Sequence, residues 1–174
     1  ALPAMILWAS AGIVVYRKKS KVLADILMIA GISIYTLFII GFWINIERPP
    51  LRTMGETRLW YSFFLSVVGY VTYRRWKYPW LLSFSALVAS VFICINLFKP
   101  EIHSKNLMPA LQSIWFIPHV TSYILSYAMF GAATVGAFVQ LRKINRKGLS
   151  DKKIFDLLDN LVYVGFGFLA LGML

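Results

Sequence analysis

Apolar runs of membrane-spanning length follow one another along most of this chain. Six can be marked, at residues 1–16, 22–46, 58–73, 79–98, 119–141 and about 161–174. A helix needs about 20 predominantly apolar residues to cross a hydrocarbon core of about 30 Å. Hydrophobic residues make up 59% of the chain, which exceeds the share typical of soluble domains. The sequence therefore predicts an all-α fold, a polytopic transmembrane bundle of about six membrane helices.

The polar segments between these runs alternate sharply in charge. The segments after the first, third and fifth runs hold four, three and six basic residues, and the other five of the 18 lie in or beside the remaining two. Lysine and arginine favour the cytoplasmic side of a membrane. We therefore expect residues 47–57, residues 99–118 and both ends of the chain to face outward.

Both ends of the chain lie within apolar runs. Ala1 opens the first run without an initiator methionine, and Leu174 closes the last run without a polar flank. We therefore expect residues 1–174 to form a single transmembrane domain that is a fragment of a longer membrane protein.

The charge and the cysteine content narrow the function classes. The net charge is +11, but the basic residues cluster beside apolar runs. We therefore expect residues 142–153 to contact the anionic lipid of the bilayer, and we expect no nucleic-acid partner. Cys94 is the single cysteine, which excludes an internal disulfide and argues against a thiol-exchange enzyme. The sequence also contains no glycine-rich phosphate loop and no HExxH motif.

One of the two histidines, His119, follows Pro118 at the head of the fifth apolar run. Proline is tolerated in the first turn of a helix, where the amide that it lacks would be unpaired anyway. Helical spacing predicts six further residues on the same face as His119: Ser122, Tyr123, Ser126, Phe130, Ala133 and Ala137. Four of the six are small, so we expect this face to point toward protein or a cavity rather than lipid.

A histidine in this place has two readings. A neutral imidazole with a free lone pair is a good axial ligand for haem iron. The residue can also be a histidine that only hydrogen-bonds a loop carbonyl, and the spacing does not separate the two readings. Upstream, residues 108–116 are expected to form a short surface helix that lays Trp115 and Phe116 beside His119, where an aromatic face can stack on a porphyrin.

Three segments resemble the cytochrome c biogenesis family of the CcsA/ResC type, which is related to CcmC and CcmF. The stretch LMPALQSIWFIPHVTSYILSYA is similar to a family segment that opens with Pro-Ala-Leu-Gln-Ser and then presents an outward-facing histidine at a helix start. RPPLRTMGET resembles the family's proline–loop–glutamate segment, and LVYVGFGFLALGML resembles the helix before its tryptophan-rich haem-binding loop. That loop, and the histidines that follow it, are missing from this sequence.

The resemblance implies a haem-handling component of cytochrome c maturation in the bacterial inner (plasma) membrane or its thylakoid-type equivalent. Such a protein holds haem b transiently and presents it at the outer face. There the haem is attached covalently to the CxxCH motif of apocytochrome c, with the help of a CcsB/ResB-type membrane partner. The resemblance leaves open whether the chain is itself an enzyme. It would be part of a cytochrome c synthase, or haem lyase, system, and the fragment alone is expected to be inactive.

The resemblance gives a role to His119, and the helix positions and predicted membrane side add five further candidates. The candidate cofactor-binding residues are His119, Trp115, Ser122, Arg48, Arg52 and Arg58. His119 matches the first of two outward histidines that ligate the haem iron, so the chain holds at most half of a bis-histidine site. The arginines lie on the same predicted side and would pair with the haem propionates, although lipid phosphate is an alternative partner. His103 lies outside the matching motif and is expected to be solvated.

Two other function classes remain open at this point. The chain can be a non-catalytic transport or scaffold bundle in which His119 lines a permeation path or only packs. It can also be a haem-bearing electron-transfer subunit, but that class usually places paired histidines well inside helices, and this chain has none there. A tryptophan-rich outward loop after Leu174 in the parent gene would discriminate among these readings, and the most informative single experiment is a haem absorption spectrum of the full-length protein, with and without His119.

Overall fold

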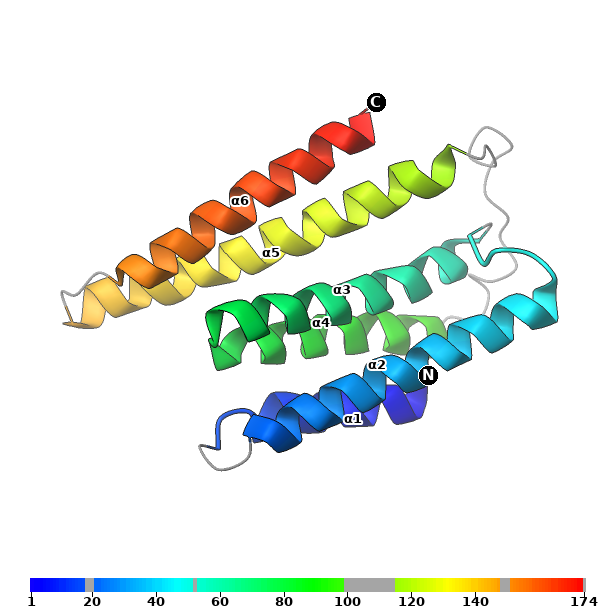
Figure 1. The fold of residues 1–174 in the computed structure, drawn as a ribbon, viewed down its shortest axis with the longest axis horizontal. Helices are drawn as coiled ribbons and strands as arrows, with labels where there is room; N and C mark the ends of the chain where they lie inside the picture. Colours follow the sequence, from blue (N-terminus) through cyan, green and yellow to red (C-terminus); the bar gives the residue numbers. More distant parts are fainter. Residues whose placement is uncertain (18–20, 52, 99–114, 148–150, 174) are drawn as a thin grey trace. The chain divides into compact units, whose positions relative to one another are not determined.

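A computed structural model describes residues 1–17, 21–51, 53–98, 115–147 and 151–173. This part of the chain contains six helices (Figure 1). Their bounds are α1 Leu2–Val14, α2 Lys21–Ile46, α3 Met54–Trp76, α4 Pro79–Phe98, α5 Phe116–Lys147 and α6 Lys152–Met173. Because these six helices follow the six apolar runs in order, the predicted all-α fold is confirmed.

Four of the helices are long and apolar enough to cross a membrane. They are α2, α4, α6 and the part of α5 from Pro118 to Arg146. Helix α1 is apolar but has only 13 residues. Helix α3 has 23 residues and carries charged side chains near both ends, Glu56 and Arg58 at one and Arg74 and Arg75 at the other. The described chain is therefore a helical membrane bundle, as the sequence predicted.

Several helices extend beyond the apolar runs from which they were predicted. Helix α3 begins four residues before Arg58, and α5 runs six residues past Leu141. Helix α6 begins at Lys152, well before the last apolar run. Hydropathy locates only the part of a helix that lies in hydrocarbon, whereas Lys, Arg, Gln and Glu are themselves good helix formers. A polar turn can therefore continue a membrane helix without leaving any trace in the apolar pattern.

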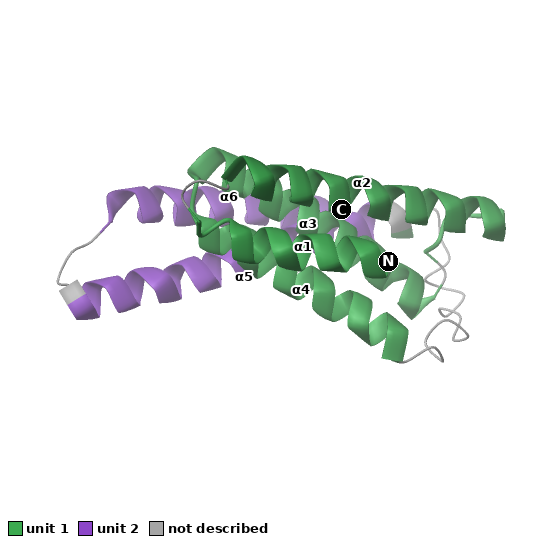
Figure 2. Cartoon of the chain, turned by 90° about the horizontal axis from the view of Figure 1, so that it is seen from below, with its two compact units in different colours: residues 1–117 green, residues 118–174 purple. Residues whose placement is uncertain are grey.

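The chain divides into two compact units, residues 1–117 and residues 118–174 (Figure 2). In the first unit, α1 packs against α2 and α4, and α3 packs against α4 and α2. The indole of Trp8 on α1 is fully buried and meets Tyr35 on α2 with ring centroids 5.2 Å apart. Gly31 makes room for this indole, because a Cβ there would lie 2.6 Å from it. The prediction of a single transmembrane domain stays a prediction.

The second unit is a hairpin of α5 and α6. Phe130 on α5 meets Phe166 on α6 edge-on, with ring centroids 5.2 Å apart. Gly165 lets the Phe130 ring approach closely, since a Cβ at this position would lie 3.0 Å from it. At the turn between the helices, the Lys143 ammonium lies 2.7 Å from the Asp151 carboxylate. The hairpin therefore combines aromatic packing along its length with an ion pair at the turn.

Helix α2 is joined to α3 by a polar contact near each end and one between them. Arg74 on α3 pairs with Asp25 on α2 at 2.8 Å. Midway, the Tyr35 hydroxyl donates a hydrogen bond of 3.3 Å to the carbonyl of Leu59. At the other end, Arg48, just beyond α2, pairs with Glu56 in the first turn of α3. Inside a membrane such contacts fix the neighbour and register of a helix, since apolar packing is less selective there.

Candidate functional site

His119 lies in the first turn of α5. The helix begins at Phe116, so Pro118 is its third residue and His119 its fourth. The prediction that Pro118 lies in the first turn of the helix is therefore confirmed, and its missing amide costs nothing there, because none of the first four amides of a helix has an intrahelical acceptor. The predicted placement of His119 at the head of a long membrane helix is confirmed.

The imidazole of His119 is exposed and touches one aromatic neighbour. Its ring meets Tyr123 edge-on, with centroids 4.7 Å apart and planes at 74°. Among the residues that the structure describes, no hydrogen bond of this imidazole to a carbonyl is seen. The ring is thus exposed among the described residues while it keeps this contact with Tyr123. A histidine in this setting can offer a ring nitrogen to a metal centre.

The helix face below His119 packs against α6. The Tyr123 ring lies opposite Gly172, where a Cβ would come within 3.2 Å of it. Ser126 is fully buried, and Phe130 packs on α6 as described above. The predicted protein-facing stripe is therefore present in the middle of α5, whereas His119 at its upper end is exposed within the described residues.

The other residues predicted near His119 are only partly described. Trp115 directly precedes α5, and 77% of its surface is exposed. Ser122 is half-buried, three residues after His119 on α5. The surface helix predicted for residues 108–116 lies almost wholly outside the described residues, and so does His103.

The loop between α2 and α3 is held by an ion pair that the sequence reasoning did not identify. Arg48 donates two hydrogen bonds to the Glu56 carboxylate, of 2.8 Å and 3.0 Å. The side chain of Glu56 is 4% exposed and that of Arg48 is 29% exposed. Such paired bonds between a guanidinium and a carboxylate are strong and directional. The hydrogen bonds to Glu56 raise the pKa of Arg48 above its ordinary value.

The same glutamate starts helix α3. The amide of Glu56 donates to the Thr53 hydroxyl, and the amide of Thr53 donates to the Glu56 carboxylate, forming a capping box. This pattern was visible in the sequence as Thr-x-x-Glu before an apolar run, which is a known helix-start signal. We call Arg48, Thr53 and Glu56 the α2–α3 clasp.

Two further contacts fix the beginning of α3. The Asn96 side chain on α4 donates a hydrogen bond of 2.9 Å to the carbonyl of Gly55. The indole N–H of Trp60 donates one of 3.0 Å to the carbonyl of Pro50. Together with the clasp, these bonds hold the start of α3 and therefore the position from which Arg58 projects.

The three candidate arginines differ in their surroundings. Arg48 is engaged by Glu56, and Arg52 lies outside the described residues. Arg58 is half-buried, and its Nη1 is buried without a hydrogen-bond partner among the residues that the structure describes. A buried guanidinium nitrogen without an acceptor is costly, so this atom is suited to an incoming anion. These arginines belong to the first unit, and His119 belongs to the second.

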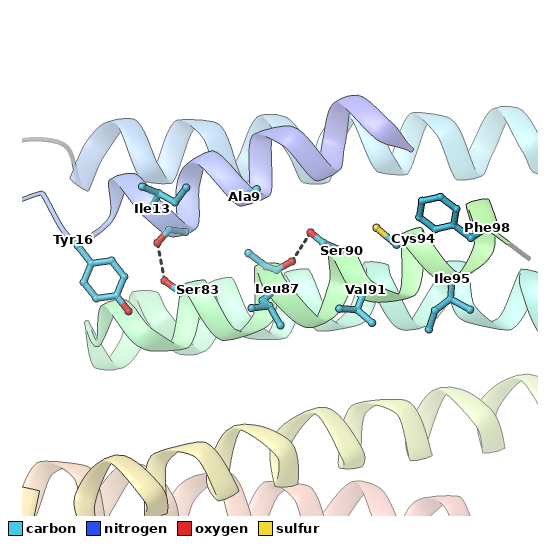
Figure 3. Close-up of a pocket in the computed structure, with 12 residues that line it drawn as sticks. Ala9, Ile13, Tyr16, Ser83, Leu87, Ser90, Val91, Cys94, Ile95 and Phe98 are labelled. Atoms are coloured by element: carbon cyan, nitrogen blue, oxygen red, sulfur yellow. Dashed lines mark hydrogen bonds between the residues drawn. The ribbon is translucent and has the colours of Figure 1, made fainter. Parts of the chain in front are cut away.

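A groove along α1 and α4 differs from this polar region because it is mostly apolar. Figure 3 shows its lining following α4 from Ser83 to Phe98. Its volume is about 760 Å³. The Ser83 hydroxyl donates to the carbonyl of Gly12 and the Ser90 hydroxyl to that of Ala86, each at 2.7 Å. Because both hydroxyls are used in these bonds, the groove presents mostly apolar side chains, as expected for a surface that faces lipid.

The observed arrangement is that of a polytopic helical membrane protein with an exposed histidine at the head of a spanning helix. Comparison of the sequence with known families identifies the family within this class. The chain belongs to the Cytochrome C assembly protein family, which it matches over residues 2–174. Groups of three or more His, Cys, Asp or Glu side chains that could hold a metal ion are not found among the described residues.

The chain is similar to several proteins named cytochrome c biogenesis protein CcsA. It is 36% identical to that of Cucumis sativus over 107 residues, which is 58% of this chain and 33% of the relative. It is 27% identical to that of Chlamydomonas reinhardtii over 173 residues, or 92% of this chain and 49% of the relative. The chain thus spans between a third and a half of these relatives. No solved structure matches it.

Proposed function

We propose that the full-length protein handles haem during cytochrome c maturation and presents it at the outer membrane face. Haem is its cargo, and apocytochrome c with a CxxCH motif is its acceptor. The family membership supports a role in cytochrome c biogenesis. The observation that carries the haem proposal is the exposed imidazole of His119 at the head of α5, in contact with Tyr123.

In this proposal His119 is one axial ligand of the haem iron. A neutral imidazole donates one nitrogen lone pair to the iron. The edge contact with Tyr123 restricts the rotation of the ring and so favours one direction of that lone pair. Trp115 supplies an aromatic face near the helix start, and Ser122 a hydroxyl on the following turn. The second axial ligand comes from a part of the protein beyond these 174 residues.

The proposed partners follow from the same role. Apocytochrome c receives the haem, and a CcsB/ResB-type membrane protein completes the complex. The lipid bilayer holds the helices, in the inner (plasma) membrane of a bacterium or in a thylakoid-type membrane. The absorption spectrum of the purified full-length protein tests the proposal, because haem b bound by histidine gives a Soret band that is absent from a scaffold or transport bundle.

Among the arginines, we propose Arg58 as the main partner of a haem propionate. A propionate could supply the acceptor that the buried Nη1 of Arg58 otherwise lacks among the described residues. Arg48 is less suited, because leaving Glu56 buried without its cation would be costly.

Replacing Arg58 by glutamine should weaken haem binding at least about tenfold, because it removes about 1.5–3 kcal/mol of charge-assisted hydrogen bonding. Haem per protein, measured by pyridine haemochrome assay in the full-length protein, gives the result. Arg52→Gln serves as the matched control and should lose less haem, whereas Arg48→Gln also breaks the clasp, so its haem content is compared per folded protein. Equal haem content in the wild type and all three variants would show that these arginines do not bind the propionates, and would favour lipid phosphate as their partner.

The proposed orientation places both ends of the 174-residue segment on the outer side. In a Cys94→Ala background, Ser104→Cys should react with an impermeant thiol reagent added from outside, and Ser150→Cys should not. The reason is the excess of basic residues in the segment that contains Ser150. Labelling of right-side-out and inverted vesicles measures this directly. The reverse pattern would overturn the orientation and place His119 on the inner side.

A further inference from the structure

A further cavity, partly open to the surroundings, lies in the first unit at the end that holds the α2–α3 clasp. Its volume is about 540 Å³. It is lined by Ala1, by Phe38, Phe42 and Ile46 of α2, by Glu56 and Leu59 of α3, and by Ile93, Asn96 and Leu97 of α4. Unlike the groove along α1 and α4, it combines apolar walls with a buried carboxylate and a buried amide.

One wall is aromatic. The rings of Phe38 and Phe42 lie one turn apart on α2, with centroids separated by 6.4 Å and planes within 10° of each other. Leu59 and Ile93, which also line the cavity, are almost fully buried. These side chains suit the apolar body of a guest molecule.

Asn96 provides the polar feature. Its residue surface is 9% exposed, and its Nδ2 donates to the carbonyl of Gly55 at 2.9 Å. This bond fixes which side of the amide is the oxygen, since Oδ1 in that place would face another acceptor. The Oδ1 atom is buried and has no hydrogen-bond partner among the described residues. A buried acceptor of this kind is uncommon and calls for a donor.

The charges around the cavity disfavour an ionic guest. Glu56 would repel an anion, and its own charge is already matched by Arg48. A neutral guest avoids both the repulsion and the cost of moving an ion out of water.

We propose that this cavity binds a neutral membrane-soluble molecule that carries a hydroxyl group on an apolar body. The hydroxyl donates to Oδ1 of Asn96, and the body lies against Phe38 and Phe42. No bond is made or broken. The proposal does not depend on haem binding, and it gives Asn96 a binding role beside its contact with the start of α3.

The test uses 4-octylphenol and its methyl ether, 4-octylanisole, which keeps the apolar body but carries a methyl group in place of the hydroxyl proton. The full-length protein in phosphatidylcholine nanodiscs is saturated with tritiated 4-octylphenol, and counts from empty nanodiscs are subtracted. We expect saturable binding that unlabelled phenol displaces, with the methyl ether at least about tenfold weaker, the effect of one buried hydrogen bond. Equal displacement by both probes, or no saturable binding, would overturn the proposal.

A variant locates the site. Asn96→Leu removes the acceptor at similar volume and should reduce phenol binding to the level of the methyl ether. Asn45→Leu is the matched control, because Asn45 is exposed on α2 and does not line the cavity, and it should bind as the wild type does. If Asn96→Leu does not fold, the probe pair on the wild-type protein still decides. If Asn96→Leu folds and keeps the preference for the phenol, the binding site lies elsewhere and the assignment is wrong.

Discussion

Replacing His119 by glycine in the full-length protein should abolish cytochrome c maturation while leaving membrane insertion intact. In the proposed haem site, the loss of one axial imidazole would remove an iron–nitrogen bond and open a coordination position, but would leave the proposed stacking and propionate contacts in place. The fold should survive, because the ring is exposed and a glycine in the first turn of α5 costs at most about 1 kcal/mol. Covalent haem on a reporter cytochrome c, detected by haem staining, measures the outcome.

Two comparisons make this experiment specific. Added imidazole can enter the vacated space and should restore part of the maturation, which would not happen if glycine had merely disturbed the helix. His103→Gly removes the other histidine of the chain and should mature cytochrome c normally. A glycine variant at His119 with a wild-type haem spectrum and normal maturation would show that this histidine only packs against Tyr123.

Replacing Glu56 by alanine should destabilise the protein by about 3 kcal/mol. Removal of one partner of a buried ion pair typically costs about 3–5 kcal/mol. The substitution leaves Arg48 without its carboxylate and also removes half of the capping box at the start of α3. Because Arg48 is 29% exposed, water relieves part of the cost and the loss falls at the lower end of that range. Unfolding in sodium dodecyl sulfate, followed by circular dichroism, gives the free energy.

The capping and charge contributions of Glu56 can be separated. Glu56→Gln keeps a side chain that can complete the capping box but loses the charge, so it should cost less than alanine. In a double-mutant cycle, Arg48→Gln combined with Glu56→Gln should cost less than the sum of the two single changes. Strictly additive costs would mean that the two side chains are neighbours without coupling, and the clasp would then be no more than a loop contact.

The helical architecture could be predicted from the sequence because each membrane helix contains a long apolar run that hydropathy detects. Each apolar run became a helix, and His119 took its predicted place at the head of α5. The helix ends were less well predicted because their polar turns, such as the one that begins with Thr53 and Glu56, carry no hydropathy signal. There the capping pattern was the informative feature.

The polar contacts of the site were mostly beyond sequence reasoning. Arg48, Arg52 and Arg58 were equivalent in the sequence, since each is a basic residue in or beside the same segment. What distinguishes Arg48 from Arg58 is the position of one carboxylate, Glu56, which depends on how the loop between α2 and α3 folds back. The hydrogen bond of the Asn96 amide was likewise not predictable from the sequence, because it depends on α4 lying beside the start of α3.

Helix α5 is longer than the hydrocarbon core of a bilayer. Its 32 residues give a rod of about 48 Å at 1.5 Å per residue, against a hydrocarbon core of about 30 Å. Hydrophobic mismatch of this kind is relieved by tilting or by projection of the polar end into water. Since His119 and the basic turn of Arg142 and Arg146 are on the same continuous rod, a thinner or thicker bilayer changes the height of the histidine relative to the lipid head groups. We therefore expect membrane thickness to affect how far this imidazole reaches into the aqueous phase.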